Sequence, residues 1–169
     1  MKGRYLLQTM LLALVLLPGI GWAQETQSVE RKGAGYAFVA PGAFWNGSTE
    51  AYSALGFGGG GERLLKAGFG ISADVGYVYY TQGGFENGFG LFSPGVLYQF
   101  QRTSKVVPFV NGGYSLAFRS DVLNMVYFGG GFNYWPKNRL GLRFEVRDQL
   151  SPSYINDNLL QFRIGLLFR

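Results

Sequence analysis

The clearest structural signal lies in the segment Phe162-Arg163-Ile164-Gly165-Leu166-Leu167-Phe168-Arg169. Every second side chain from Phe162 to Phe168 is large and apolar, and most of the side chains between them are polar or small. The segment Leu140-Gly141-Leu142-Arg143-Phe144-Glu145-Val146-Arg147 repeats the pattern. A period of two with one apolar face is typical of a β-strand. The sequence therefore predicts two consecutive strands here.

The same alternation continues towards the N-terminus. It predicts six further strands: 33–44, 51–62, 69–80, 92–100, 110–118 and 126–134. The apolar pattern is weaker in the first two of these, because glycine and alanine occupy many of their positions, and clear in the last four. A strand tilted near 45° needs about 9–11 residues to cross a bilayer, and closing the sheet removes its exposed edges. We therefore expect an all-β fold, an eight-stranded antiparallel up-and-down transmembrane β-barrel.

The two faces of the predicted strands differ strongly. One face is apolar in almost every strand, and the other is sparsely charged and rich in glycine and alanine, whereas a water-facing surface is normally ~25–35% charged. We expect the apolar face to point to lipid, with Phe144, Phe162, Ile164, Leu166 and Phe168 as examples. The charged side chains of the other face are expected to form a network in the lumen: Asp74, Arg119, Arg143, Glu145, Arg147 and Arg163.

Strand ends and connections support a membrane barrel. Aromatic girdles mark the two interfaces of such barrels, and we expect Phe44, Tyr79, Tyr80, Phe89 and Phe118 at one rim and Phe69, Phe100, Tyr134 and Phe168 at the other. Three short, net basic connections, 62–66, 102–105 and 136–139, alternate with net acidic ones that are mostly longer: 45–50, 81–87, 120–123 and 148–158. Outer-membrane barrels have short turns inside and longer loops outside.

The N-terminus has the features of an export signal. Lys2 and Arg4 precede an apolar stretch, and Gly21-Trp22-Ala23 offers a cleavage site for a signal peptidase. We expect residues 1–23 to be a cleaved signal peptide and residues 24–169 to be the barrel domain.

The eight alternating strands, the export signal and the pattern of 162–169 resemble the small outer-membrane β-barrel proteins of Gram-negative bacteria, the outer-membrane-protein-A or X type. This resemblance implies residence in the cell outer membrane. It also implies contact with membrane lipid and lipopolysaccharide, and with the barrel-assembly machinery during insertion. We expect the protein to be a monomer. We also expect it to bind no nucleic acid, because the formal net charge of +5 comes mostly from residues of the signal, the turns and the lumen.

Catalytic chemistry finds little support in the 169 residues. The chain has no cysteine and no histidine, which removes thiol catalysis, thiolate metal sites and the commonest general base. The lipid A deacylase and palmitoyltransferase families, which share this barrel size, rely on a histidine, so their chemistry has no counterpart here. The run Gly56–Gly61 matches GxGxxG only in letters, because a phosphate site needs a following helix. We expect no catalytic, cofactor or metal site, and no cofactor.

Three functions remain open at this level. The first is a non-enzymatic structural protein for membrane integrity or surface interaction. The second is a narrow anion-preferring pore, because four arginines would face two carboxylates in the lumen and positive rings favour anions. The third is an exported soluble carrier of the lipocalin type, whose apolar face would point inward around a ligand.

Overall fold

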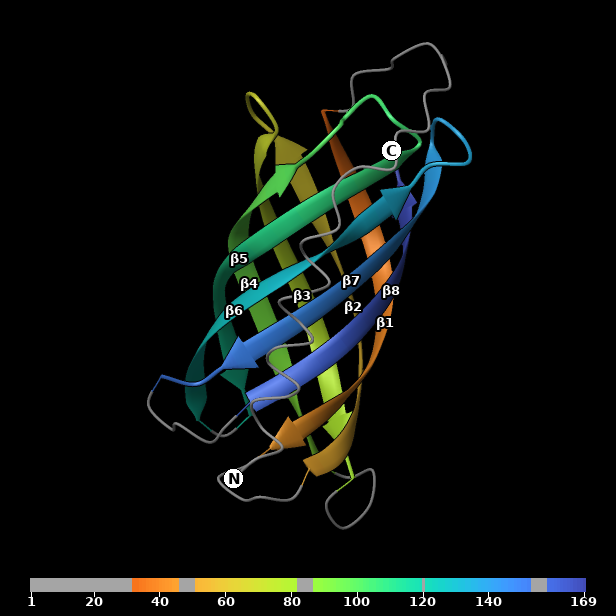
Figure 1. Cartoon of the computed structure of the whole chain (residues 1–169). Coiled ribbons are helices and arrows are strands. Elements are labelled where there is room, and N and C mark those ends of the chain that lie inside the picture. The colour runs from red at the N-terminus through yellow and green to blue at the C-terminus, as the bar shows by residue number, and fades with distance from the viewer. Residues whose placement is uncertain (1–31, 46–50, 82–86, 120, 153–157) are drawn as a thin grey trace, which may run out of the picture.

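The computed structural model describes residues 32–45, 51–81, 87–119, 121–152 and 158–169, which form a barrel of antiparallel strands (Figure 1). The strands are β1 (Gly33–Trp45), β2 (Ala51–Leu64), β3 (Phe69–Tyr80), β4 (Asn87–Gln99), β5 (Val106–Phe118), β6 (Val122–Tyr134), β7 (Leu140–Leu150) and β8 (Asn158–Phe168). The predicted eight-stranded up-and-down barrel is confirmed. The expected signal peptide, residues 1–23, lies outside the described residues. No helix in the described ranges is long and apolar enough to cross a membrane.

The first and last strands meet and close the sheet. Val39 of β1 lies opposite Ile164 of β8, and Gly35 lies opposite Phe168. The Phe168 ring covers Gly35 closely, an arrangement in which an aromatic side chain shields a strand glycine. Each of the described strands therefore has a partner strand on both sides, as expected of a closed barrel.

The two ends of the barrel carry different connections. We call the end with connections 65–68, 100–105 and 135–139 the turn end; β1 begins there and β8 ends there. The opposite end is the loop end. Strand β2 continues to Leu64, two residues beyond the predicted boundary, and a tight turn follows, with Ala67 and Gly68 at φ 51° and 90°. Glycine adopts such angles without steric cost.

The outer wall is apolar and the inner face holds the buried polar groups. Val75, Val96 and Leu166 are 56%, 62% and 62% exposed on the outer wall, whereas Asp74, Arg143 and Arg163 are buried. The alternation of the strands produces this separation, because successive side chains point to opposite faces. A soluble lipocalin-like carrier would have the opposite arrangement, so that alternative is wrong.

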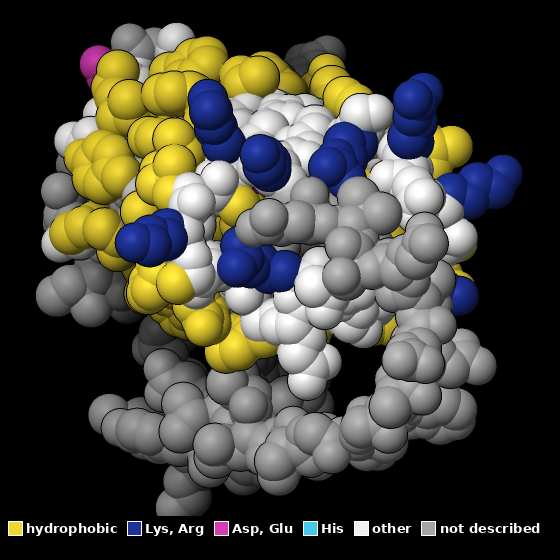
Figure 2. All heavy atoms as spheres, turned by 90° about the horizontal axis from the view of Figure 1, so that it is seen from above, with side chains coloured by type: hydrophobic (Ala, Val, Ile, Leu, Met, Phe, Trp, Pro, Cys, Tyr) yellow, Lys and Arg dark blue, Asp and Glu magenta, His cyan; other side chains and the backbone are white. Residues whose placement is uncertain are grey.

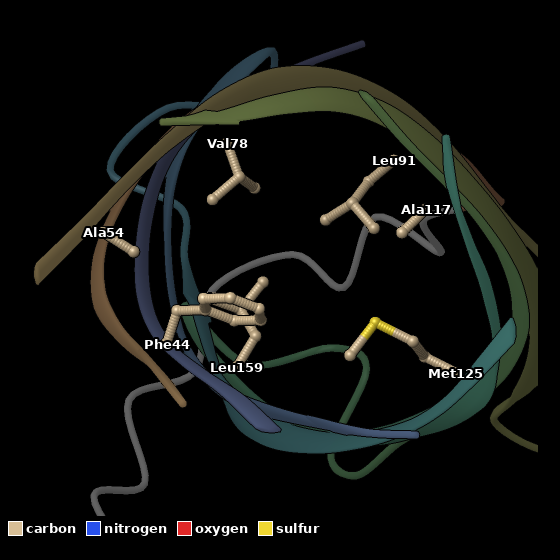
Figure 3. Close-up of a cluster of buried hydrophobic side chains, with 7 residues drawn as sticks. All are labelled: Phe44, Ala54, Val78, Leu91, Ala117, Met125 and Leu159. Carbon is tan, nitrogen blue, oxygen red and sulfur yellow. The ribbon is translucent and has the colours of Figure 1, made fainter. Parts of the chain in front are cut away.

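The barrel interior has three layers. Near the loop end, seven buried apolar side chains from seven strands point inward (Figure 3): Phe44, Ala54, Val78, Leu91, Ala117, Met125 and Leu159. Near the turn end, Tyr36, Val107, Trp135 and Leu167 form a second apolar cluster. A belt of buried polar and charged side chains lies between the two clusters.

Part of the expected rim of aromatic side chains lies inside instead. Phe44 belongs to the apolar cluster near the loop end, and Tyr80 and Phe89 pack against it. All three occupy inward-facing positions of β1, β3 and β4, where Phe44 is buried and the other two are partly buried. At the turn end, Phe69, Tyr134 and Phe168 are on the outer wall and Phe100 is exposed just beyond β4.

Candidate functional site: the interior charge network

Strand β7 supplies the centre of the polar belt. Arg143, Glu145 and Arg147 occupy alternate positions, so all three side chains point inward. Each is at most 4% exposed. A buried charge without a partner is costly, so the other strands must provide opposite charges at this level.

Glu145 accepts hydrogen bonds from the two arginines that lie two residues before and after it in β7. Arg143 Nε lies 2.9 Å from Glu145 Oε2, and Arg147 Nε lies 2.7 Å from Glu145 Oε1. Asn111 of β5 donates from Nδ2 to Glu145 Oε1 at 2.9 Å. Both carboxylate oxygens of Glu145 are therefore occupied by charge-assisted hydrogen bonds.

Two carboxylates from the opposite wall complete the pairs. Arg143 Nη1 lies 2.8 Å from Glu62 Oε2 of β2, and Gln99 Nε2 donates to Glu62 Oε1 at 2.6 Å. Arg147 Nη1 lies 3.1 Å from Asp74 Oδ2 of β3. The network therefore ties β7 to strands that are not its neighbours in the sheet.

Strand β8 joins the same network through Arg163. Its Nη2 lies 3.0 Å from Asp74 Oδ1, and its Nη1 lies 3.7 Å from Glu145 Oε1. The hydroxyl of Tyr36 on β1 donates to Asp74 Oδ2 at 3.2 Å. Asp74 thus accepts hydrogen bonds from β1, β7 and β8 at once.

Aromatic faces cover the guanidinium planes of the three arginines. The Arg143 Cζ atom lies 3.9 Å from the ring centroid of Phe109, the Arg147 Cζ 4.2 Å from that of Tyr127, and the Arg163 Cζ 3.6 Å from that of Phe38. Such contacts attract a cation most strongly when water is excluded. The arginines are therefore held by carboxylates at their edges and by rings on their faces.

Inward-facing glycines make room for these rings. Gly58 of β2 lies opposite Gly76 of β3, and a Cβ atom at Gly58 would come 2.8 Å from Phe38 Cζ and closer still to the backbone of β3. The glycines at this position therefore have a steric role. Phe38 can lie beneath Arg163 only because the wall beside it has no side chain.

A pair of alanine substitutions in β2 tests this packing. Gly58→Ala is expected to lower the free energy of unfolding by about 1–3 kcal/mol, the usual cost of overpacking. Gly61→Ala is the control, because a Cβ there would lie 3.7 Å from the nearest heavy atom outside its chain neighbours, the Ala34 carbonyl oxygen. Urea unfolding of both variants in lipid vesicles measures the difference; equal stabilities would contradict the packing account.

The structure brings together five of the six predicted network residues and corrects the sixth. Asp74, Arg143, Glu145, Arg147 and Arg163 are buried and joined by ion pairs. Arg119 is exposed beyond the end of β5, and its Nη1 donates to Asn87 Oδ1 at 3.4 Å. Its placement in the lumen is wrong, because β5 ends at Phe118 at the loop end, above the polar belt.

Glu62 is the network residue that the sequence analysis missed. It lies where the predicted strand 51–62 meets the predicted connection 62–66, whereas β2 continues past it to Leu64 and its side chain is 3% exposed inside the barrel. The alternation of the strand could have identified it, since Glu62 lies on the same face of β2 as Ala54, Gly56, Gly58 and Gly60. Within the described residues the interior therefore holds three arginines and three carboxylates, rather than four and two.

The described parts of the chain contain no group of three or more carboxylates, histidines or cysteines that could hold a metal ion. Each interior carboxylate is engaged by at least one arginine. The arrangement can hold the strands together across the lumen.

The outer-wall residues named from the sequence lie where they were expected. Phe162, Ile164, Leu166 and Phe168 of β8 are each about half exposed, between 48% and 62%. Phe144 of β7 is also on the outer wall, where its ring stacks on Phe132 with centroids 5.0 Å apart.

The closed sheet, the apolar outer wall and the paired interior charges define the class: this is a small eight-stranded transmembrane β-barrel. No family model matches the sequence, and no curated protein matches it.

Several solved structures share the fold, among them outer-membrane barrels. Neisserial surface protein A is 13% identical, with a TM-score of 0.60 over 80% of this chain and 96% of that one. The N-terminal β-barrel domain of Pseudomonas aeruginosa OprF is 16% identical, with a TM-score of 0.54 over 79% and 97%. The outer membrane enzyme PagL is 15% identical, with a TM-score of 0.53 over 79% and 99%.

Proposed function

We propose that the protein is a non-enzymatic outer-membrane barrel, closed to ions, that contributes to membrane integrity or to surface contacts through its loops. The observation that carries this proposal is the filled interior, in which a balanced charge network lies between two apolar clusters. The fold shared with Neisserial surface protein A and OprF supports residence in the outer membrane.

The interior charges support a structural role over an anion-preferring pore. A pore that selects anions needs a surplus of positive charge along its path. In this barrel Arg143, Arg147 and Arg163 face Glu62, Asp74 and Glu145, so the described interior has no surplus. The cluster near the loop end adds a second obstacle, because an ion would lose its hydration shell among apolar side chains.

The sequence supports the absence of catalysis. PagL is an outer membrane enzyme, but its likeness to this chain is one of fold. The present chain has no histidine and no cysteine, and its interior carboxylates are paired with arginines.

The proposal is tested by recovering the protein from expressing cells and measuring conductance. We expect it in the outer-membrane fraction, with a folded form that migrates differently on a gel before and after boiling. In planar lipid bilayers the folded protein should give no current steps. Anion-selective steps from correctly folded protein would contradict the closed barrel, and release by osmotic shock would contradict the membrane location.

A further inference from the structure

Basic side chains are concentrated at the turn end of the barrel (Figure 2). Eight lysines and arginines lie in or beside its turns and strand ends: Lys32, Arg63, Lys66, Arg102, Lys105, Lys137, Arg139 and Arg169. Among the described residues, no aspartate or glutamate is exposed at this end. We call these eight residues the basic rim.

The basic rim lies at the edge of the apolar outer wall. Arg63 pairs in register with Ile71, and Arg139 directly precedes Leu140, which is 55% exposed. Lys66 lies in the turn before Phe69, which is 61% exposed. In a membrane barrel the apolar wall ends where the headgroups begin, so these cations lie at headgroup depth.

The loop end differs from the turn end. Arg119 is the one cation that the structure describes outside the barrel interior at the loop end, and it bonds to Asn87. The interior carboxylates cannot compensate the basic rim, because Glu62, Asp74 and Glu145 are buried against interior arginines. The outer surface is therefore strongly asymmetric in charge along the barrel axis.

We propose that the basic rim binds the phosphate groups of anionic phospholipids in the leaflet at the turn end, an inference that rests on the proposed function. Guanidinium groups bind phosphate through paired N–H donors, and lysines act as point charges. An acidic protein partner is a weaker fit, because the cations are spread over the end of the barrel and not gathered on one flank (Figure 2).

The test compares lipid association by electron paramagnetic resonance. Folded protein is placed in phosphatidylcholine vesicles that contain spin-labelled phosphatidylglycerol or spin-labelled phosphatidylcholine. We expect the phosphatidylglycerol label to associate more strongly with the wild type. The triple variant Arg63→Gln/Lys66→Gln/Arg139→Gln removes three of the eight cations of the basic rim, so its preference for the phosphatidylglycerol label should be weaker than that of the wild type.

Controls separate this inference from the proposed function. Arg119→Gln should retain the preference, because Arg119 is at the loop end. High salt should weaken the preference by screening, whereas inorganic phosphate at constant ionic strength should leave it unchanged if lipid is the ligand. Equal association of the two labels with inserted protein would overturn the basic-rim proposal alone. Failure to insert into phosphatidylcholine vesicles would instead overturn the proposed function.

Discussion

Glu145→Gln is expected to lower the free energy of unfolding by about 3–5 kcal/mol, the usual cost of removing one partner from a buried ion pair. Glutamine keeps the shape of the side chain but removes its charge. Arg143 and Arg147 would then share only Glu62 and Asp74 with Arg163, leaving one uncompensated positive charge in the interior. The expected readout is a lower midpoint of urea unfolding in lipid vesicles.

Three further variants, Arg119→Gln, Arg147→Gln and Glu145→Gln/Arg147→Gln, make this measurement specific. Arg119→Gln is the matched surface control, and it should change stability by about 0.5 kcal/mol or less, because Arg119 is exposed. Adding Arg147→Gln to Glu145→Gln restores the charge balance, so the double variant should lose less stability than the two single variants together. Additive losses would show that the interior charges do not act as one network.

The outward and inward faces of the strands could be predicted because they depend on alternation alone. Phe162, Ile164 and Leu166 follow a strict period of two, and a single period fixes the side of the sheet to which each points. Arg143, Glu145 and Arg147 follow the same rule on the opposite face. The closed barrel is then expected because closing a sheet of eight such strands removes its exposed edges.

The partners of the interior charges could not be predicted in the same way. Which carboxylate meets Arg143 depends on the stagger of eight strands, because Glu62 reaches it from across the barrel. Strand ends were a second source of error. Glu62 lies where the predicted strand 51–62 meets the predicted connection 62–66, and it faces inward because β2 continues to Leu64; the end of β5 decides that Arg119 lies outside.

The apolar cluster near the loop end was missed for a related reason. Phe44, Tyr80 and Phe89 lie at strand ends, where an aromatic ring can face either a lipid interface or the barrel interior. Aromatic residues are enriched at the lipid interfaces of membrane proteins, which favours the lipid interface for a ring at a strand end. Their inward phase and the space left by small neighbours such as Ala54 and Ala117 decide for the second.

The orientation of the apolar wall towards lipid is the central claim, and two valines of similar exposure test it. Val75 lies mid-strand in β3 and is 56% exposed, and Val122 begins β6 at the loop end and is 62% exposed. Arginine on the lipid face costs about 2–4 kcal/mol at the bilayer midplane and about 0–1 kcal/mol near the interfaces.

The most direct measurement is therefore the unfolding free energy of Val75→Arg and Val122→Arg in lipid vesicles. We predict that Val75→Arg is destabilised by about 2–4 kcal/mol and Val122→Arg by about 1 kcal/mol or less. If both variants were as stable as the wild type, the outer wall would face water and the membrane barrel would be contradicted.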